Sequence, residues 1–169
     1  MWYAGIGSRD TPSNLENIIS KIARNLELAG FILRSGGADG ADKMFSNGVV
    51  RAENKEIYLP WKGFNFSDSE LYGVCNAAIL TVNKYHPSPS FLSDAGVKLM
   101  ARNAYQVLGK DLNTPSKFVL CWTPGGKEVG GTSQAIRIAK DKGIPVYNLF
   151  SDDIRLKFLN TEFVNSLIS

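Results

Sequence analysis

Short apolar runs alternate with longer amphipathic stretches along this chain, and this alternation constrains its fold more than any other feature. A short apolar run is typical of a buried strand, and apolar residues at helical spacing are typical of an amphipathic helix. Strands that alternate with helices form parallel sheets through right-handed crossover connections. We therefore predict an α/β fold, a three-layer Rossmann-like parallel sheet with helices on both faces, as a single domain over residues 1–169. The predicted strands are residues 2–6, 31–34, 56–60, 117–122 and 144–149.

The helices are predicted from caps and glycine stops. Ser13 and Glu16 have the spacing of a capping box, and Gly30 supplies the stop of the first helix. Ser93 is a predicted cap as well. The secondary structure of residues 61–91 is the hardest to predict, because aromatic residues and prolines interrupt any regular pattern. This segment either closes one side of the core as a surface excursion or forms a rim over a pocket. The remaining predicted helices are residues 41–52, 93–108, 133–142 and 152–167.

Glycine-bearing turns follow three of the predicted strands. They are Gly7-Ser8-Arg9, the stretch from Ser35 to Asp42, and Pro124-Gly125-Gly126 with Gly130-Gly131-Thr132. The carboxyl ends of parallel strands share one edge of a sheet, so these turns are expected to converge on one crevice. Main-chain N–H groups in such turns and at helix starts suit phosphate or another anion. The combination of three turns is more specific than any one of them.

The second turn carries the sharpest local signal. Paired Gly36 and Gly37 let the main chain approach a ligand closely, although the same glycines also suit a tight turn without a ligand. Asp39 and Asp42 either cap the following helix or bind ribose hydroxyls, as acidic residues do in dinucleotide sites. Arg9 in the first turn either offers a planar fork to a phosphate or is a solvated loop arginine.

The third turn and one helix supply further candidate residues. The segment before Thr132 is neither a Walker loop nor a GxGxxG motif, but it places glycines and hydroxyls at a helix start. Arg102 and Asn103 lie inside a predicted helix, where they either border a ligand or belong to a solvated face. Trp61 either stacks on a base or belongs to the core.

Composition excludes several classes of function. The formal net charge is +3, and positive and negative residues are interspersed along the chain. This charge pattern does not require that the protein bind a nucleic-acid backbone as its main function. With Cys75, Cys121 and His86 as the only cysteines and histidine, a zinc site or a Ser-His-Asp arrangement is not expected. We expect no cofactor and no metal. The amino terminus lacks the pattern of a signal peptide and no run approaches membrane-spanning length, so a cytoplasmic protein without a membrane partner is expected.

Taken in order, these residues resemble the SLOG superfamily, which groups the Smf/DprA proteins with the LOG phosphoribohydrolases in a Rossmann-like fold. The pattern is most similar to the small YspA-like branch of uncharacterised proteins, often found in bacteria and phages. The resemblance spans roughly residues 2–149. Its landmarks are Gly7-Ser8-Arg9, Ser35 to Asp42, Pro60-Trp61, Arg102-Asn103, Gly131-Thr132 with Ala135, and Gly143-Ile144-Pro145-Val146.

The resemblance implies a nucleotide or nucleotide-derived ligand across the glycine turns. LOG enzymes use a helix arginine, to which Arg102 is similar, and a glutamate, where this chain has Gln134 and Ala135. A phosphoribohydrolase activity would then need a substitute carboxylate from Asp39, Asp42, Asp94 or Glu128. DprA-like proteins bind single-stranded DNA, and Asp39 stands where their turn commonly has arginine.

We therefore expect a sensor or sequestering protein for a nucleoside phosphate, a nucleotide sugar or a cyclic ADP-ribose-like signal. The alternatives are a hydrolase of an N-glycosidic or phosphate-sugar bond and a DprA-like protein that binds single-stranded DNA. Nucleic acid is the less expected partner. A homodimer or higher oligomer is possible, and the apolar face of the helix at 93–108 is a candidate seam for it. The expected ligand-binding residues are Gly7, Ser8, Arg9, Ser35, Gly36, Gly37, Asp39, Asp42, Trp61, Arg102, Asn103, Pro124, Gly125, Gly126, Gly131 and Thr132.

Overall fold

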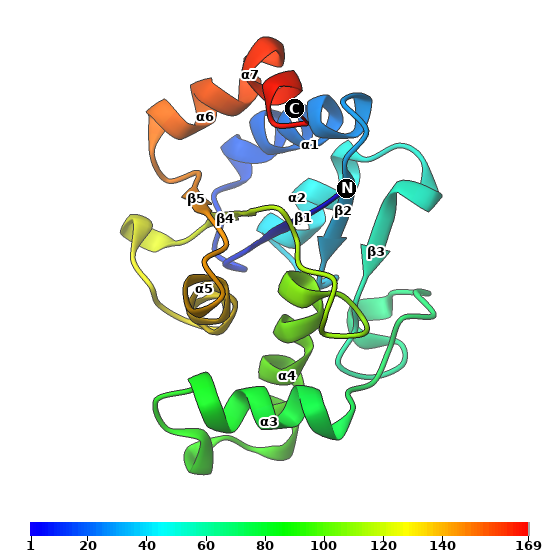
Figure 1. The fold of residues 1–169 in the computed structure, drawn as a ribbon, viewed down its shortest axis with the longest axis vertical. Helices are drawn as coiled ribbons and strands as arrows, with labels where there is room; N and C mark the ends of the chain where they lie inside the picture. The colour runs from blue at the N-terminus through cyan, green and yellow to red at the C-terminus, as the bar shows by residue number, and fades with distance from the viewer. Residues whose placement is uncertain (169) are drawn as a thin grey trace.

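The central sheet is parallel throughout, with its strands in the order β3-β2-β1-β4-β5 (Figure 1). The structure is a computed structural model, and it describes residues 1–168. Because β1 is central, the strand order reverses beside it, where chains of this topology leave a crevice at the carboxyl edge. The strands are β1 (Trp2–Gly7), β2 (Ile32–Ser35), β3 (Lys55–Ile57), β4 (Val119–Trp122) and β5 (Val146–Asn148).

Helices cover both faces of this sheet, so the predicted three-layer α/β architecture is confirmed. Successive residues of β1 enter opposite layers: Tyr3 packs in one core with Phe118, and Ala4 packs in the other with Val119. The first core lies under α1, α2, α6 and α7, and the second lies under α4 and α5. The helices are α1 (Glu16–Leu28), α2 (Ala41–Gly48), α3 (Asn76–Tyr85), α4 (Asp94–Leu108), α5 (Thr132–Asp141), α6 (Asp152–Leu159) and α7 (Thr161–Ser166).

Several predicted element bounds are corrected. The predicted capping box is not formed, because Ser13 begins a short 3-10 turn, η1 (Ser13–Leu15), and makes no side-chain cap. The last predicted helix is two helices, since the Asn160 side chain accepts hydrogen bonds from two main-chain N–H groups and starts α7. The predicted cap at Ser93 is observed, with its hydroxyl accepting from the N–H of Gly96 at 3.1 Å.

Residues 61–91, whose secondary structure could not be predicted, contain α3. This helix packs on α4 around a third small core that includes Ala78, Val82 and Tyr105. Asp141 at the end of α5 accepts hydrogen bonds from Lys84 and Tyr85 of α3, at 3.2 and 2.5 Å. In Figure 1, α3 and α4 extend away from the end of the molecule that carries α6 and α7.

The apolar face of α4 is covered by this chain itself. Ala101, Ala104 and Val107 are completely buried against α3, the sheet and α5. The expectation that this face forms a homodimer seam is therefore wrong for its carboxyl-terminal half. Among residues 1–168, no helix combines the length and the apolar character that crossing a bilayer requires.

Candidate functional site

A crevice with a volume of about 350 Å³ lies at the carboxyl edge of the sheet, beside the end of β1. It is bounded by the turn after β1, the second half of the turn after β2, one side of α4 and the start of α5. The lining residues are Ile6, Gly7, Ser8, Arg9, Asp10, Ala38, Asp42, Leu99, Met100, Arg102, Asn103, Gln106, Val129, Gly130, Gly131 and Thr132.

The main chain of the first turn is anchored by the protein. The N–H of Gly7 donates to Asp42 Oδ1 at 3.2 Å, and the N–H of Ser8 donates to the carbonyl of Trp122 at 3.0 Å. A Cβ at Gly7 would lie 2.6 Å from the Ala41 Cβ, so the close packing of this turn on α2 requires glycine. The amides that we expected to face a ligand here therefore have protein partners, whereas the side chain of Arg9 is exposed at the crevice.

Gly36 and Gly37 serve packing inside the protein. The carbonyl of Gly36 accepts a hydrogen bond from Arg102, and a Cβ on Gly36 would overlap that guanidinium. Gly37 has a φ of +68°, and its carbonyl accepts from Asn65 at 3.0 Å. Ser35 is buried and donates to the carbonyl of Gly5. These three residues shape the site from behind and do not line the crevice.

Asp42 is a buried carboxyl group between two turns. Its Oδ1 accepts from Gly7 and its Oδ2 accepts from the N–H of Ala38 at 3.4 Å, so it ties the turn after β1 to the turn after β2. Burial raises the pKa of Asp42 to about 6, against the lowering influence of Arg102 and of main-chain N–H groups. Asp39 is exposed, accepts from Asn65 at 3.2 Å and lies outside the crevice lining.

Arg102 is a cation placed inside the protein at the crevice, with only 6% of the residue exposed. Its guanidinium donates to the carbonyl groups of Gly36 and Tyr58, the latter at 3.2 Å. Its Nε has no hydrogen-bond partner among the described residues. Burial lowers the pKa of Arg102, the charge of Asp42 raises it and that of Arg9 lowers it further. Buried polar groups are normally paired, so an unpaired buried N–H on a residue that lines a crevice calls for an explanation.

Two amide side chains continue the same wall of α4. Asn103 donates to the carbonyl of Gly131 at 2.8 Å and so attaches α4 to the loop before α5. Gln106 is buried and lines the crevice one helical turn after Arg102. Sequence reasoning missed Gln106, although its spacing from Arg102 on the same helix would have indicated it. The other lining residues that it missed are Ile6, Asp10, Leu99, Met100 and Val129, whereas Ala38 and Gly130 lie in turns that were expected to converge on the crevice.

The first half of the third predicted turn lies outside the crevice lining. Pro124, Gly125 and Gly126 form the 3-10 turn η5 (Pro124–Gly126), which does not line the crevice, and a Cβ on Gly126 would lie 3.4 Å from the Phe150 ring. Gly131 and Thr132 do line the crevice, at the start of α5. Trp61 packs edge-on against Phe64, with ring centroids 5.3 Å apart, and is outside the lining too.

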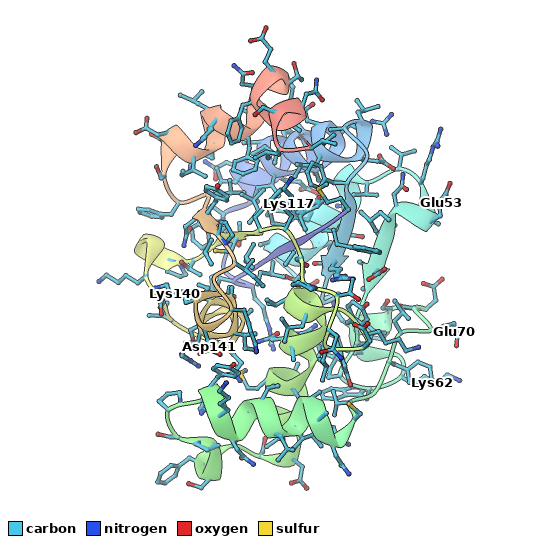
Figure 2. The ribbon with its side chains drawn as sticks, viewed as in Figure 1. Glu53, Lys62, Glu70, Lys117, Lys140 and Asp141 are labelled. Carbon is cyan, nitrogen blue, oxygen red and sulfur yellow. The ribbon has the colours of Figure 1, made fainter. Side chains whose placement is uncertain are left out.

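Most of the residues considered for a LOG-like reaction lie outside the crevice lining. Gln134, which the resemblance places where LOG enzymes have a glutamate, is completely buried and donates to the carbonyl of Thr81 at 3.3 Å. Glu128 forms an ion pair with Lys140 of α5, and Lys140 is labelled in Figure 2. Glu128 and Asp94 both lie outside the crevice lining. Among the described residues, Asp42 and Asp10 are the carboxyl groups that line the crevice.

Comparison with known proteins supports the fold. No family model and no curated protein matches this sequence. One solved structure with the same fold is DNA processing protein A from Helicobacter pylori, which was determined for insight into its mode of binding single-stranded DNA. The two chains superpose with a TM-score of 0.61 and 18% sequence identity, over 99% of this chain and 80% of the other. At this identity the likeness establishes the Rossmann-like fold that the two proteins share.

Proposed function

We propose that the crevice binds one nucleotide unit of a single-stranded nucleic acid and holds it through its phosphate. The proposal rests on the chemistry of the crevice, and it agrees with the DNA-binding function described for a protein of the same fold. We also propose that the chain is a small relative of the Smf/DprA proteins within the SLOG superfamily, in its YspA-like branch. That assignment rests on the glycine turns and on Arg102-Asn103.

The observation that carries the proposal is Arg102, a buried cation that lines the crevice and whose Nε has no hydrogen-bond partner among the described residues. A guanidinium offers five donors in a fixed planar fork, which matches the oxygens of a phosphate. Two carbonyl groups hold the other end of this fork, so the cation is already oriented before a ligand arrives. An incoming phosphate oxygen would supply the acceptor that Nε lacks and a counter-charge for the buried cation.

The remaining contacts are assigned by position. Arg9 would pair with the phosphate from the mouth of the crevice, because its side chain is exposed there. Gly131 and Thr132 would offer N–H groups from the first turn of α5, where helix amides have no partner within the helix. Asp42 would face the sugar hydroxyls rather than the phosphate, since like charges repel.

The proposal is tested by binding of an oligothymidine of about ten nucleotides, followed by fluorescence anisotropy, to wild-type protein and two matched variants. Arg102→Gln removes the crevice cation and should weaken binding by about 10- to 100-fold, the value of a charge-assisted hydrogen bond. Arg137→Gln is the control, because the Nε of Arg137 also lacks a partner among the described residues but lies outside the crevice. Equal losses in both variants, or no binding by the wild type, would reject the proposal.

The second candidate is a free nucleotide-derived ligand, held as a sensor or sequestering protein would hold it. The volume of about 350 Å³ favours it, because small-molecule sites begin at about 300 Å³. Incubation with AMP, NAD and cyclic ADP-ribose, followed by mass spectrometry of the denatured mixture, distinguishes the outcomes. Intact ligand released from the protein supports a sensor, whereas free base with sugar phosphate supports the hydrolase alternative.

A further inference from the structure

A short turn that packs on Arg102 presents a phenylalanine to solvent. This turn is η3 (Phe64–Phe66), which follows β3 and precedes α3. Phe66 is fully exposed, and no other large apolar side chain among the described residues is more exposed. Both Asn65 and Phe66 have positive φ angles, of +50° and +59°. Asparagine adopts this conformation readily, but an aromatic residue rarely does, so the main chain is strained at Phe66.

The η3 turn is attached directly to elements that form the site. The Asn65 side chain donates to the carbonyl of Gly37 at 3.0 Å and to Asp39 at 3.2 Å, which fixes it on the turn after β2. The ring of Phe64 lies over the guanidinium of Arg102, 5.8 Å from its carbon to the ring centroid. Polar contacts with the turn after β2 and aromatic packing on Arg102 therefore hold the η3 turn, and of these partners Arg102 lines the crevice.

The three aromatic residues near this turn have different environments. Trp61 and Phe64 pack edge to face, and Phe64 covers Arg102. Phe66 has no aromatic partner among the described residues and contributes nothing to the buried core. Exposed apolar surface combined with unfavourable backbone angles opposes folding, so stability alone does not account for this arrangement.

We propose that Phe66 is a stacking platform for a base next to the nucleotide held in the crevice. This inference rests on the proposed function and extends it from one nucleotide to two or more. Aromatic side chains beside cationic grooves bind single-stranded nucleic acid by stacking, which tolerates any base because every base has a π face. A free mononucleotide has no neighbouring base, so Phe66 would select a strand over a mononucleotide.

The positive charge near the η3 turn is compatible with a bound nucleic-acid strand. Lys62 is exposed close to Phe66 in sequence, and Figure 2 shows it projecting at the edge of the molecule, with Glu70 on the same side. Its ammonium lies 5.7 Å from the centroid of the Tyr72 ring and belongs to no ion pair among the described residues. A strand that leaves the crevice over Phe66 would pass a cation that is free to contact a phosphate.

The experiment compares thymidine monophosphate with an oligothymidine of about ten nucleotides. Phe66→Ala should weaken oligonucleotide binding by about 5- to 150-fold, the effect of losing one stacked base, and should leave mononucleotide binding unchanged. Phe66→Trp should retain the oligonucleotide affinity. Phe91→Ala is the matched control, because Phe91 is almost as exposed in another 3-10 turn, η4 (Pro89–Phe91), and it should not change binding.

A second variant separates binding from folding. Phe66→Gly relieves the positive φ, so its melting temperature should be equal to or above that of the wild type while its oligonucleotide affinity falls. Unchanged oligonucleotide affinity in Phe66→Ala, while Arg102→Gln still weakens both ligands, would overturn the platform and leave the proposed function intact. A wild type that binds neither ligand would overturn the proposed function, and the platform with it.

Discussion

Arg102 illustrates how one buried side chain can serve both structure and binding. Its guanidinium supplies donors to the carbonyl groups of Gly36 and Tyr58, which lie on two different connections of the sheet. It also lowers the pKa of Asp42, opposing the effect of burial on that carboxyl group. Removal of this cation would therefore disturb three neighbours at once, and stability must be measured beside binding.

Arg102→Met should lower the free energy of unfolding by about 2–4 kcal/mol, because it leaves two buried carbonyl groups without their donors. The measurement is urea denaturation at neutral pH. In a double-mutant cycle with Asp42→Asn, the two losses should not add, since the two charges interact. Simple additivity would contradict the coupling of these residues.

Asp42 makes both stability and binding depend on pH. Its pKa in the folded protein is raised from 3.8 to about 6, so the folded state holds this proton more tightly than the unfolded chain does. The contribution of Asp42 to stability is therefore complete below 3.8 and is lost as the pH rises through about 6. Relative to Asp42→Asn, the free energy of unfolding of the wild type should fall by about 2–3 kcal/mol across this pH range, as measured by urea denaturation.

The same titration should change the affinity for an oligonucleotide. Arg9, Asp10 and Arg102 are the other charged residues that line the crevice, and Asp42 adds a negative charge to it above about pH 6. Binding of an oligonucleotide without a terminal phosphate should weaken by at least about threefold as this charge forms. A terminal phosphate is avoided because its second ionisation falls at about the same pH. Asp42→Asn should show no such dependence.

At the scale of elements, Glu27 joins α1 to the connection between α2 and β3. Its carboxylate accepts from the N–H groups of Val50 and Arg51, both at 2.9 Å, and from Asn54 at 3.1 Å. Burial alone would raise its pKa, but these hydrogen bonds and one from Arg24 lower it to about 2. The connection that leads into the edge strand β3 is therefore held by a single side chain of α1.

Glu27→Ala should lower the free energy of unfolding by about 2–4 kcal/mol, since it leaves main-chain N–H groups without an acceptor. Because the folded pKa is lowered, the contribution of the wild-type residue is present above 4.5 and is lost as the pH falls toward about 2. Glu53→Ala is the control on the same connection, where Glu53 projects outward from the turn η2 (Ala52–Asn54) (Figure 2). A comparable loss in the control would show that the connection, rather than the carboxylate, is sensitive.

The elements show which parts of the fold the sequence could predict. The strands and the helices that flank them were predictable, because buried parallel strands are apolar runs that end in glycine turns. Helix α3 was not, since its buried residues Ala78 and Val82 face α4 rather than the sheet, and only the tertiary structure pairs these helices. The break at Asn160 was missed because a capping residue inside an amphipathic pattern gives little signal.

The candidate site was predicted in part for a similar reason. The sequence indicated Arg9, Asp42 and Arg102, and all three line the crevice. It could not indicate that Gly36 leaves room for a guanidinium rather than for a ligand, because the partner lies on a helix far along the chain. Phe66 gave no signal in the sequence, since its exposure depends on how residues 61–67 are folded.

At the scale of the whole molecule, the charge distribution limits how strongly a strand can be held. The formal net charge is +3, and the cations that line the crevice are Arg9 and Arg102. Each phosphate contact to a single strand contributes about −0.7 to the slope of log K against log salt. Binding should therefore show a shallow salt dependence, unlike that of a protein with an extended basic surface.

The expected slope is about −1.4 for two contacts and about −2 with Lys62, measured by anisotropy over a range of salt concentrations. Arg9→Gln should make the slope shallower by about 0.7, because it removes one contact. Lys117→Gln is a control on the segment before β4, where the lysine donates to the carbonyl of Leu167. A slope steeper than about −4 would place the strand on a larger surface than the crevice.

The central position of β1 also has a consequence for how the chain is made. Ribosomes release β1 first, and β2 and β3 can join one side of it early, but β4 begins only at Val119. Until then, the opposite side of β1 is an open apolar edge, which can pair with another nascent chain. The time needed to translate the residues between β3 and β4 therefore sets how long this edge stays unpaired.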